Sequence, residues 1–289
     1  MLRKYLGVRP KKIQAFTGVG YNGRAVVKVP TGETYDFFML RTNLKPESLN
    51  IKCRLNGKDF YDAPATLFNS IDAYKNVLDY SGLVPDGESI IIIPFADLSM
   101  KLKDGQQQTS LVTMAGEELI LEVDIAAKGT GDPATPTLSV HPVANTPQAV
   151  RIFLPRIEKH TIPAPAAGEN QFSSIPSVMG RNIRRIHFKT DAITELEIKR
   201  DGDEAYATDT VLERYRAARN GRVWQDGFFH LDFLMRGYIR NELFPTERQQ
   251  ELLFSLHTSK VVNSIESFIE YLDIERQDLL VQAVAQNSK

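Results

Sequence analysis

The sequence predicts a mostly β protein that holds two copies of one fold, on three observations. Apolar runs of five to eight residues alternate with Gly, Asn-Gly, Asp-Gly and Pro, which is typical of strands and tight turns. Helical patterns are confined to Ser70–Tyr80, Asp209–Ala218 and Asp273–Gln286. Similar segments also recur in the same order in the two halves, as a duplicated chain requires.

The clearest strands lie next to turn residues. Ile51–Leu55 alternates apolar and polar residues and then meets Asn56-Gly57, which predicts a half-buried strand that enters a hairpin turn. Ser89–Ile93 is rich in β-branched residues and stops at Pro94, which predicts a strand covered on both faces. Two further strands of similar composition are predicted at Glu118–Val123 and Phe228–Phe233.

Four pairs of segments support the duplication. Their separation along the chain falls from 148 through 145 and 140 to 133 residues, as expected if the second copy has shorter loops. The pairs are Leu40–Asn43 with Phe188–Asp191, Ile51–Gly57 with Ile198–Gly202, Val84–Gly87 with Trp224–Gly227, and Glu118–Leu121 with Glu251–Phe254.

A proline-rich passage over 129–165 separates the copies, because proline removes ladder donors and interrupts helices. A strand at Thr137–Val140 is expected to close the first copy at a sheet edge. We place the boundary so that 1–147 is the first domain and 148–289, with the C-terminal helical stretch, the second. Tandem copies of about eight strands predict an all-β chain of two jelly-roll sandwiches with a few short helices.

Composition excludes several classes of protein. The 42% hydrophobic and 25% charged residues are those of a globular protein, and a net charge of -1 argues against a polycation that coats nucleic acid. The single cysteine, Cys53, rules out an internal disulfide framework. No apolar run reaches the length of a transmembrane helix, and the first residues lack the apolar core of a secretory signal. We expect synthesis in a reducing cytosol.

No pattern of catalytic residues emerges. Gly18–Gly23 spells GxGxxG, but the β-branched segment that follows predicts a hairpin turn at Asn22-Gly23 and not a phosphate-binding loop. The five histidines lack the spacing of metal ligands and are expected at the surface or rim. No serine lies in a GxSxG motif, which would mark a nucleophile. Cys53 fits a packed position in a strand. The chain is therefore predicted not to be an enzyme.

Two charged stretches are candidate sites. Asp201, Asp203 and Glu204 surround a turn and could offer oxygen ligands to calcium, although the rest of an EF-hand loop is absent and a solvated turn is favoured. No other cofactor or metal is expected. The other candidate is a basic stretch, Arg181–Lys189, which is predicted to be a solvated strand end or a subunit contact.

The first 32 residues carry no acidic side chain and form a basic arm. We expect the arm to contact phosphates of lipid headgroups or nucleic acid; a mobile, solvated terminus is the alternative. The candidate membrane-facing residues are Arg3, Lys4, Arg9, Lys11 and Lys12.

The strand and turn patterns also resemble a known family. The segments that carry the resemblance are Thr34–Arg41, Ile51–Gly57, Ile90–Asp97 and Glu118–Asp124 in the first copy, with Ile183–His187, Ile198–Gly202 and Gly227–Phe233 in the second. They are similar to the double jelly-roll major capsid proteins of tailless icosahedral double-stranded DNA viruses with an internal membrane, which include corticoviruses, tectiviruses and their marine relatives.

This resemblance implies a structural capsid protein that forms homotrimers with pseudo-hexagonal outlines. Its partners would be itself, neighbouring trimers, penton or minor capsid proteins and, peripherally, the internal viral membrane, without specific nucleic acid. The resemblance also implies that the protein is assembled in the host cytoplasm and is located in the virion capsid. It further implies calcium at the contacts between subunits. The alternative is a jelly-roll receptor- or carbohydrate-binding module such as a spike or adhesin, which would need an exposed aromatic platform; the single tryptophan, Trp224, is the residue to test.

Overall fold

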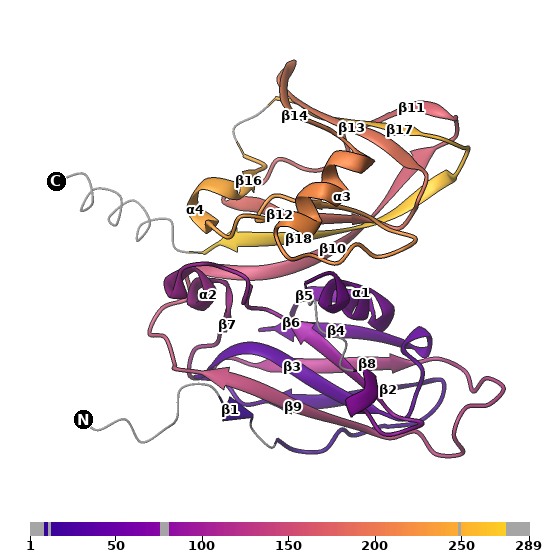
Figure 1. The fold of residues 1–289 in the computed structure, drawn as a ribbon. Helices are drawn as coiled ribbons and strands as arrows, with labels where there is room; N and C mark the ends of the chain where they lie inside the picture. Colours follow the sequence, from indigo (N-terminus) through magenta and orange to yellow (C-terminus); the bar gives the residue numbers. More distant parts are fainter. Residues whose placement is uncertain (1–8, 11–12, 76–80, 248–249, 276–289) are drawn as a thin grey trace. The chain divides into compact units, whose positions relative to one another are not determined.

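The computed structural model describes residues 9–10, 13–75, 81–247 and 250–275 (Figure 1). The chain divides into two compact units, of which the first holds residues 1–73, 78–155 and 275–289 and the second holds residues 74–77 and 156–274. The boundary predicted after residue 147 falls between the last strand of the first unit, which ends at Asn145, and the long strand that begins at Phe153.

The first unit contains two antiparallel sheets. One has the order β2-β8-β4-β5, formed by β2 (Gly23–Val29), β8 (Leu119–Ile125), β4 (Leu49–Leu55) and β5 (Lys58–Pro64). The other has the order β1-β9-β3-β6, formed by β1 (Arg9–Pro10), β9 (Leu138–Asn145), β3 (Thr34–Thr42) and β6 (Ser89–Pro94), with β7 (Leu111–Val112) also beside β3. The helical elements are α1 (Ala65–Lys75), α2 (Lys103–Thr109) and the 3-10 turns Pro46–Ser48 and Ser81–Leu83.

The second unit repeats this arrangement. Its first sheet has the order β11-β17-β13-β14, formed by β11 (Gly168–Phe172), β17 (Leu252–Thr258), β13 (Ile193–Arg200) and β14 (Asp203–Asp209). Its other sheet has the order β10-β18-β12-β15, formed by β10 (Phe153–Ala164), β18 (Asn263–Ile274), β12 (Arg181–Phe188) and β15 (Phe229–Asp232), with β16 (Phe244–Pro245) also beside β12. Two helices complete the unit, α3 (Thr210–Arg219) and α4 (Ile239–Glu242).

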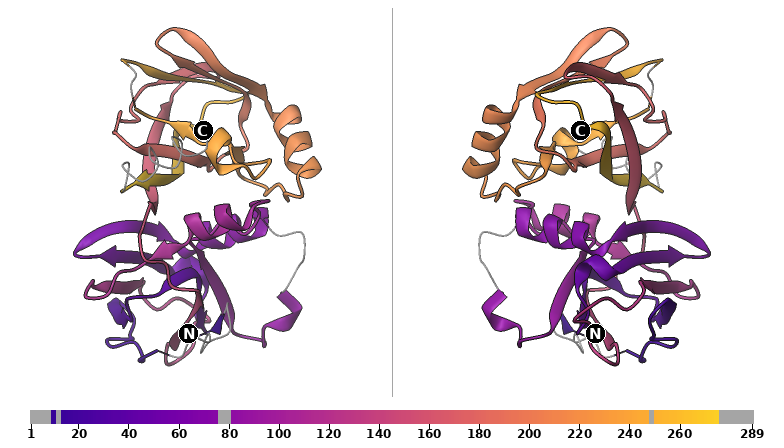
Figure 2. Two further views of the ribbon diagram at one scale, coloured as in Figure 1. Left: turned by 90° about the vertical axis from the view of Figure 1, so that its left-hand side faces the viewer. Right: turned by 90° about the vertical axis from the view of Figure 1, so that its right-hand side faces the viewer.

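The two units share one strand topology, which confirms the prediction of a duplicated all-β fold. Each strand in the order β1-β9-β3-β6 has a counterpart in β10-β18-β12-β15, and β2-β8-β4-β5 matches β11-β17-β13-β14. Figure 2 shows the two sheets of each unit as separate layers, as in a jelly-roll sandwich.

The irregularities of the strands recur as well. The ladder of β3 with β9 is bulged between Tyr35 and Phe37, and that of β12 with β18 between Ile183 and Arg185, at the predicted offset of 148. Bulges are built features that bend a strand and re-aim its side chains, so their recurrence supports one ancestral fold.

The predicted hairpin of the first copy and its counterpart in the second copy both form with two left-handed residues. Asn56 and Gly57 have φ of 50° and 78° between β4 and β5, while Asp201 and Gly202 have φ of 51° and 90° between β13 and β14. Two consecutive positive φ values match the twist of the flanking strands, and Asn, Asp and Gly tolerate them best. Each hairpin leads into a helix, α1 in the first unit and α3 in the second.

Aromatic residues join the two sheets of the first unit. Phe95 is fully buried, and its ring centroid lies 4.8 Å from that of Phe38 on β3 and 5.4 Å from that of Tyr61 on β5. In the second unit the core draws buried residues from both sheets, including Ile186 on β12 and Leu196 on β13.

Two expectations about strands were wrong in detail. Strand β6 is not covered on both faces: Ile91 and Ile93 are buried but Ile90 is 41% exposed, because β6 lies at a sheet edge with one face toward the core. The strand predicted at Thr137–Val140 is β9, which extends to Asn145 and lies between β1 and β3 instead of at the edge.

Of the three predicted helices, one is confirmed, one begins earlier than predicted, and one lies mostly outside the described residues. The helix predicted over Asp209–Ala218 is confirmed as α3, whereas α1 begins at Ala65, five residues before the predicted start. Of the stretch predicted as helix over Asp273–Gln286, the first two residues end β18, and residues 276–286 lie outside the described residues. In the GxGxxG segment Gly23 opens strand β2, and only Asn22 of the predicted Asn22-Gly23 turn has positive φ.

Candidate subunit-contact surfaces

The basic arm is described only in part. The backbone of Arg9 and Pro10 pairs with Ala144 and Val143 of β9. The other candidate membrane-facing residues lie outside the described residues; they are Arg3, Lys4, Lys11 and Lys12.

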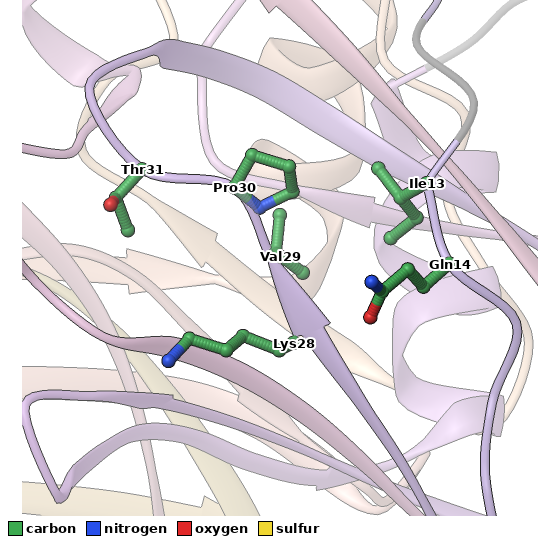
Figure 3. Close-up of a pocket in the computed structure, with 6 residues that line it drawn as sticks. All are labelled: Ile13, Gln14, Lys28, Val29, Pro30 and Thr31. Carbon is green, nitrogen blue, oxygen red and sulfur yellow. The ribbon is translucent and has the colours of Figure 1, made fainter.

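An open pocket of about 620 Å³ lies between two described segments of the first 32 residues. Ile13 and Gln14 line one side, and Val29, Pro30 and Thr31 at the end of β2 line the other (Figure 3). Lys28 reaches its rim and is paired there with Glu118 at 3.2 Å. The pocket offers mainly apolar surface and no cluster of reactive groups.

Helix α3 presents an exposed apolar face in the second unit. The carboxylate of Asp209 caps the helix by accepting a 2.8 Å hydrogen bond from the N–H of Leu212, and Ala217 is buried on the inner side. On the outer side Val211 is 76% exposed and Tyr215 66% exposed. Figure 2 shows α3 at the outer surface of this unit. Large exposed apolar side chains on adjacent turns are typical of an interaction surface.

The outer face of sheet β2-β8-β4-β5 carries paired charges instead. Arg24 on β2 and Asp124 on β8 are 2.5 Å apart, and Arg54 on β4 lies 3.0 Å from Glu122 on β8. Because opposite charges meet across neighbouring strands, this face is locally balanced and offers no strongly charged patch.

The acidic turn is held by the backbone of a segment about 50 residues further along the chain. Asp201 Oδ1 accepts hydrogen bonds of 2.7 Å and 2.8 Å from the N–H groups of Gln250 and Glu251. Asp203 and Glu204 are exposed at the start of β14, and no three His, Cys, Asp or Glu side chains converge on a metal site within the described ranges. The turn is exposed, and Asp201 and Gly202 at its corner both have positive φ.

Two predictions about basic and histidine residues were wrong. Arg184 and Arg185, expected at a solvated strand end or a subunit contact, are 1% and 0% exposed within the single chain and can serve as neither. His187 and His230, expected at the surface or rim, are fully buried. The alternation of β12 places Arg185 and His187 opposite the core residues Ile186 and Phe188, but it does not reveal that this second face is also covered.

Cys53 confirms the prediction of a packed position in β4. Its side chain is fully buried, and burial raises the pKa of the thiol, which disfavours a nucleophilic thiolate. No helix in the part of the chain that the structure describes is long and apolar enough to cross a membrane.

The family comparisons agree with this architecture. The model of the viral coat protein P2 N-terminal domain matches residues 10–144, and that of the C-terminal domain matches residues 154–275. No curated protein is significantly similar in sequence.

Solved structures show the same fold. The crystal structure of the major capsid protein P2 from bacteriophage PM2 superposes with a TM-score of 0.81 at 17% identity, covering 93% of this chain and 98% of that one. A chain of Sulfolobus turreted icosahedral virus gives a TM-score of 0.65 at 10% identity, covering 96% and 93%. VP54 of PBCV-1 gives 0.64 at 9% identity, covering 95% and 97%.

Both domain models of one family together span the two sandwiches, and the fold matches capsid proteins over almost the whole chain. This family is structural and not catalytic, in line with the prediction from the sequence. The chain belongs to the viral coat protein P2 family and is a double jelly-roll capsid protein.

Proposed function

We propose that this chain is the major capsid protein of an icosahedral virus and acts as a homotrimer that tiles the shell. The observation that carries this proposal is the repetition of one strand topology in both units of a single chain. Three such chains bring six similar sandwiches together, which gives a trimer a nearly hexagonal outline and lets it pack in a flat lattice. Contacts between neighbouring trimers can then close into a shell.

The trimer is tested by light scattering on the purified protein during size-exclusion chromatography. We expect a complex with the mass of three 32.5-kDa chains. A chain that stays monomeric at high protein concentration contradicts the proposal.

The finer assignments belong to the same proposal. The sandwiches are proposed to be 1–147 and 148–289, and the partners to be neighbouring trimers, penton or minor capsid proteins and, peripherally, an internal membrane. Assembly would take place in the host cytoplasm. The membrane contact is assigned to the basic arm, because cationic side chains are attracted to anionic lipid headgroups by about 1 kcal/mol each.

The arm is tested with vesicles that contain phosphatidylserine. Replacing Arg3, Lys4, Lys11 and Lys12 by Gln is expected to weaken salt-sensitive sedimentation with these vesicles. The control, matched in the number of charges removed, replaces the exposed residues Lys45, Lys58, Lys101 and Lys128 outside the arm by Gln and is expected to bind as the parent does. Equal binding of the arm variant and the parent would remove the membrane role and leave the trimer untouched.

Helix α3 is the surface on which we propose a contact between copies. Val211 and Tyr215 are exposed in the isolated chain. Burying their apolar side chains against a second copy lowers the free energy of the assembled state. The double variant V211D/Y215D is expected to keep the fold and lose assembly, while V211I/Y215F keeps both. If the Asp variant assembled at the same protein concentrations as the parent, this contact would be refuted.

The alternative of a carbohydrate-binding module lacks its aromatic platform. The ring of Trp224 is half-buried and packs edge-on against Phe229 and His230, with centroid distances of 5.6 Å and 5.4 Å. Arg214 lies 5.4 Å from the Trp224 ring. A ring engaged in this way offers little free face for stacking on a sugar.

A further inference from the structure

A buried cluster of ionisable side chains lies on the sheet face opposite the core of the second unit. At its centre His187 on β12 and His230 on β15 stand directly opposite each other in the ladder, with their Nδ1 atoms 2.8 Å apart. His187 Nε2 is also 2.8 Å from Oε1 of Glu270 on β18. All three side chains are at most 1% exposed.

The first unit shows that the fold does not require charge at these positions. By the offset of 148, Arg185 and His187 correspond to Phe37 and Met39. Glu270 pairs with Arg185 just beyond the bulge, where the first unit pairs Val143 with Phe37. Buried ionic groups are costly compared with apolar residues of similar size, so Arg185 and His187 at positions where the first unit has Phe37 and Met39 point to a task beyond stability.

The charges around the histidines come from every element that packs here. The strands contribute Arg184 and Arg185 (β12), Glu270 (β18) and Asp232 (β15). The helices contribute Glu213 (α3), Arg222 just after α3, and Tyr74 and Lys75 at the C-terminal end of α1, which belong to the second unit. Arg185 is 2.9 Å from Asp232, and Lys75 is 3.6 Å from Glu270.

The edge strand β15 depends on these titratable contacts. It pairs with β12 through four residue pairs, of which two are polar and buried: Arg185 with Asp232 and His187 with His230. Aromatic rings cover the second pair, since His230 stacks with Phe228 at 5.5 Å and lies 4.3 Å from the ring of Tyr74. One of the four cross-strand pairs of β15 is therefore a contact between two imidazoles, which added protons turn into a contact between like charges.

The hydrogens on the ring nitrogens determine when the contact between His187 and His230 breaks. Glu270 accepts as a carboxylate, so His187 Nε2 carries a hydrogen, and of the two facing Nδ1 atoms one donates while the other accepts. If both imidazoles are protonated, each Nδ1 carries a hydrogen that points at the other, and two like charges meet at 2.8 Å in a dry site. The pair cannot persist in that state.

We propose that β15, with the segment over 222–235 that covers it, is a proton-operated latch that is closed near neutral pH and opens in acid when His187 and His230 are both charged. Its opening uncovers the outer face of sheet β10-β18-β12-β15 and loosens the second unit, while the first unit, with apolar residues at the equivalent positions, stays closed. A coat subunit would thereby sense an acidic environment through one of its two sandwiches.

Hydrogen exchange measured by mass spectrometry tests the latch on the full chain. After correction for intrinsic exchange, we expect the protection of amides in 222–235 to fall at least tenfold between pH 7 and pH 5, because an added proton shifts the opening equilibrium by about tenfold per pH unit. Amides of β3 in the first unit are expected to keep their protection.

The double variant H187M/H230F removes both imidazoles and places in β12 the residue found at the equivalent position of the first unit. We expect its protection in 222–235 to be the same at pH 7 and pH 5. The control H141Q, in the first unit, is expected to behave like the parent. Unchanged protection in the parent, or an equal loss in the double variant, would overturn the proposal.

If the double variant does not fold, imidazole ¹⁵N shifts of the parent supply the test. The latch requires that the closed form, which dominates these spectra, never holds both imidazoles charged. Shifts that show at least one uncharged imidazole while protection falls support it, and shifts of a doubly charged pair while 222–235 is still protected refute it.

Discussion

Arg151 holds Glu117 with two parallel hydrogen bonds, each 2.9 Å long, in the first unit. The same guanidinium donates to the carbonyl of Val112 at 2.9 Å and to Glu275 at 2.7 Å. Burial by itself raises the pKa of Glu117, but the bonds from Arg151 and from the Met114 N–H outweigh it and hold that pKa below its usual range. One arginine thus ties together three separate segments of the unit.

Replacing Arg151 by Met is expected to destabilise the first unit by about 2 to 3 kcal/mol, because it removes the charged partner of the partly buried Glu117 carboxylate. Calorimetric unfolding measures the effect. The control R41M removes an exposed pair with Glu88 and is expected to cost less than about 1 kcal/mol. Equal losses in the two variants would contradict the role of Arg151.

Phe95 is predicted to be a main support of the first sandwich, since its ring contacts residues of both sheets. Phe95→Ala removes these contacts and leaves a cavity, with an expected cost of about 3 to 5 kcal/mol. The control Leu83→Ala, at a side chain that is 80% exposed, is expected to cost less than about 0.5 kcal/mol. Near-UV circular dichroism during urea unfolding compares them, and a loss below about 1 kcal/mol for Phe95→Ala would show that the sheets do not depend on this ring.

The stability of the second unit is expected to fall in acid. Burial lowers the pKa of His230 to about 2, from 6.5, with the neighbouring His187 acting in the same direction. Its contribution is therefore complete above pH 6.5 and decreases as the pH falls below 6.5, because the unfolded chain then binds a proton that the folded chain does not. The slope approaches about 1.4 kcal/mol per pH unit.

Glu270 adds to this dependence at lower pH. Burial alone would raise its pKa, but Lys75, Arg184, Arg185 and the bond with His187 hold it well below 4.5, so its contribution is lost as the pH falls below that value. Trp224, the single tryptophan, reports on this unit by fluorescence during urea titrations at pH 7.5, 6, 5 and 4. A free energy of unfolding that does not change over this range contradicts the prediction.

The Cys53 thiol is expected to resist modification in the folded protein, because it is buried and burial raises its pKa. A disulfide reagent is expected to label no thiol at pH 8 in buffer and one thiol in urea. The control Leu83→Cys places a thiol at a position that is 80% exposed and is expected to react at once. Rapid labelling of native Cys53 would show that β4 opens readily.

Local patterns were enough to predict the repeated part of the fold. Asn56-Gly57 and Asp201-Gly202 adopt paired left-handed conformations that few other residues tolerate, and the N-cap residue Asp209 marks the start of α3. The offsets of 148, 145, 140 and 133 place matching segments at equivalent positions in the two units. Backbone conformation and hydrophobic alternation depend on near neighbours, so the sequence alone reveals them.

What covers each face was decided only by the tertiary structure. Alternation shows that Arg185 and His187 share a face of β12, but their burial depends on β15, on Glu270, which is 83 residues from His187, and on the ring of Tyr74. For the same reason the exposure of Ile90 follows from the edge position of β6. A strand's sequence specifies which side chains point the same way; long-range packing determines whether they meet water, apolar residues or charge.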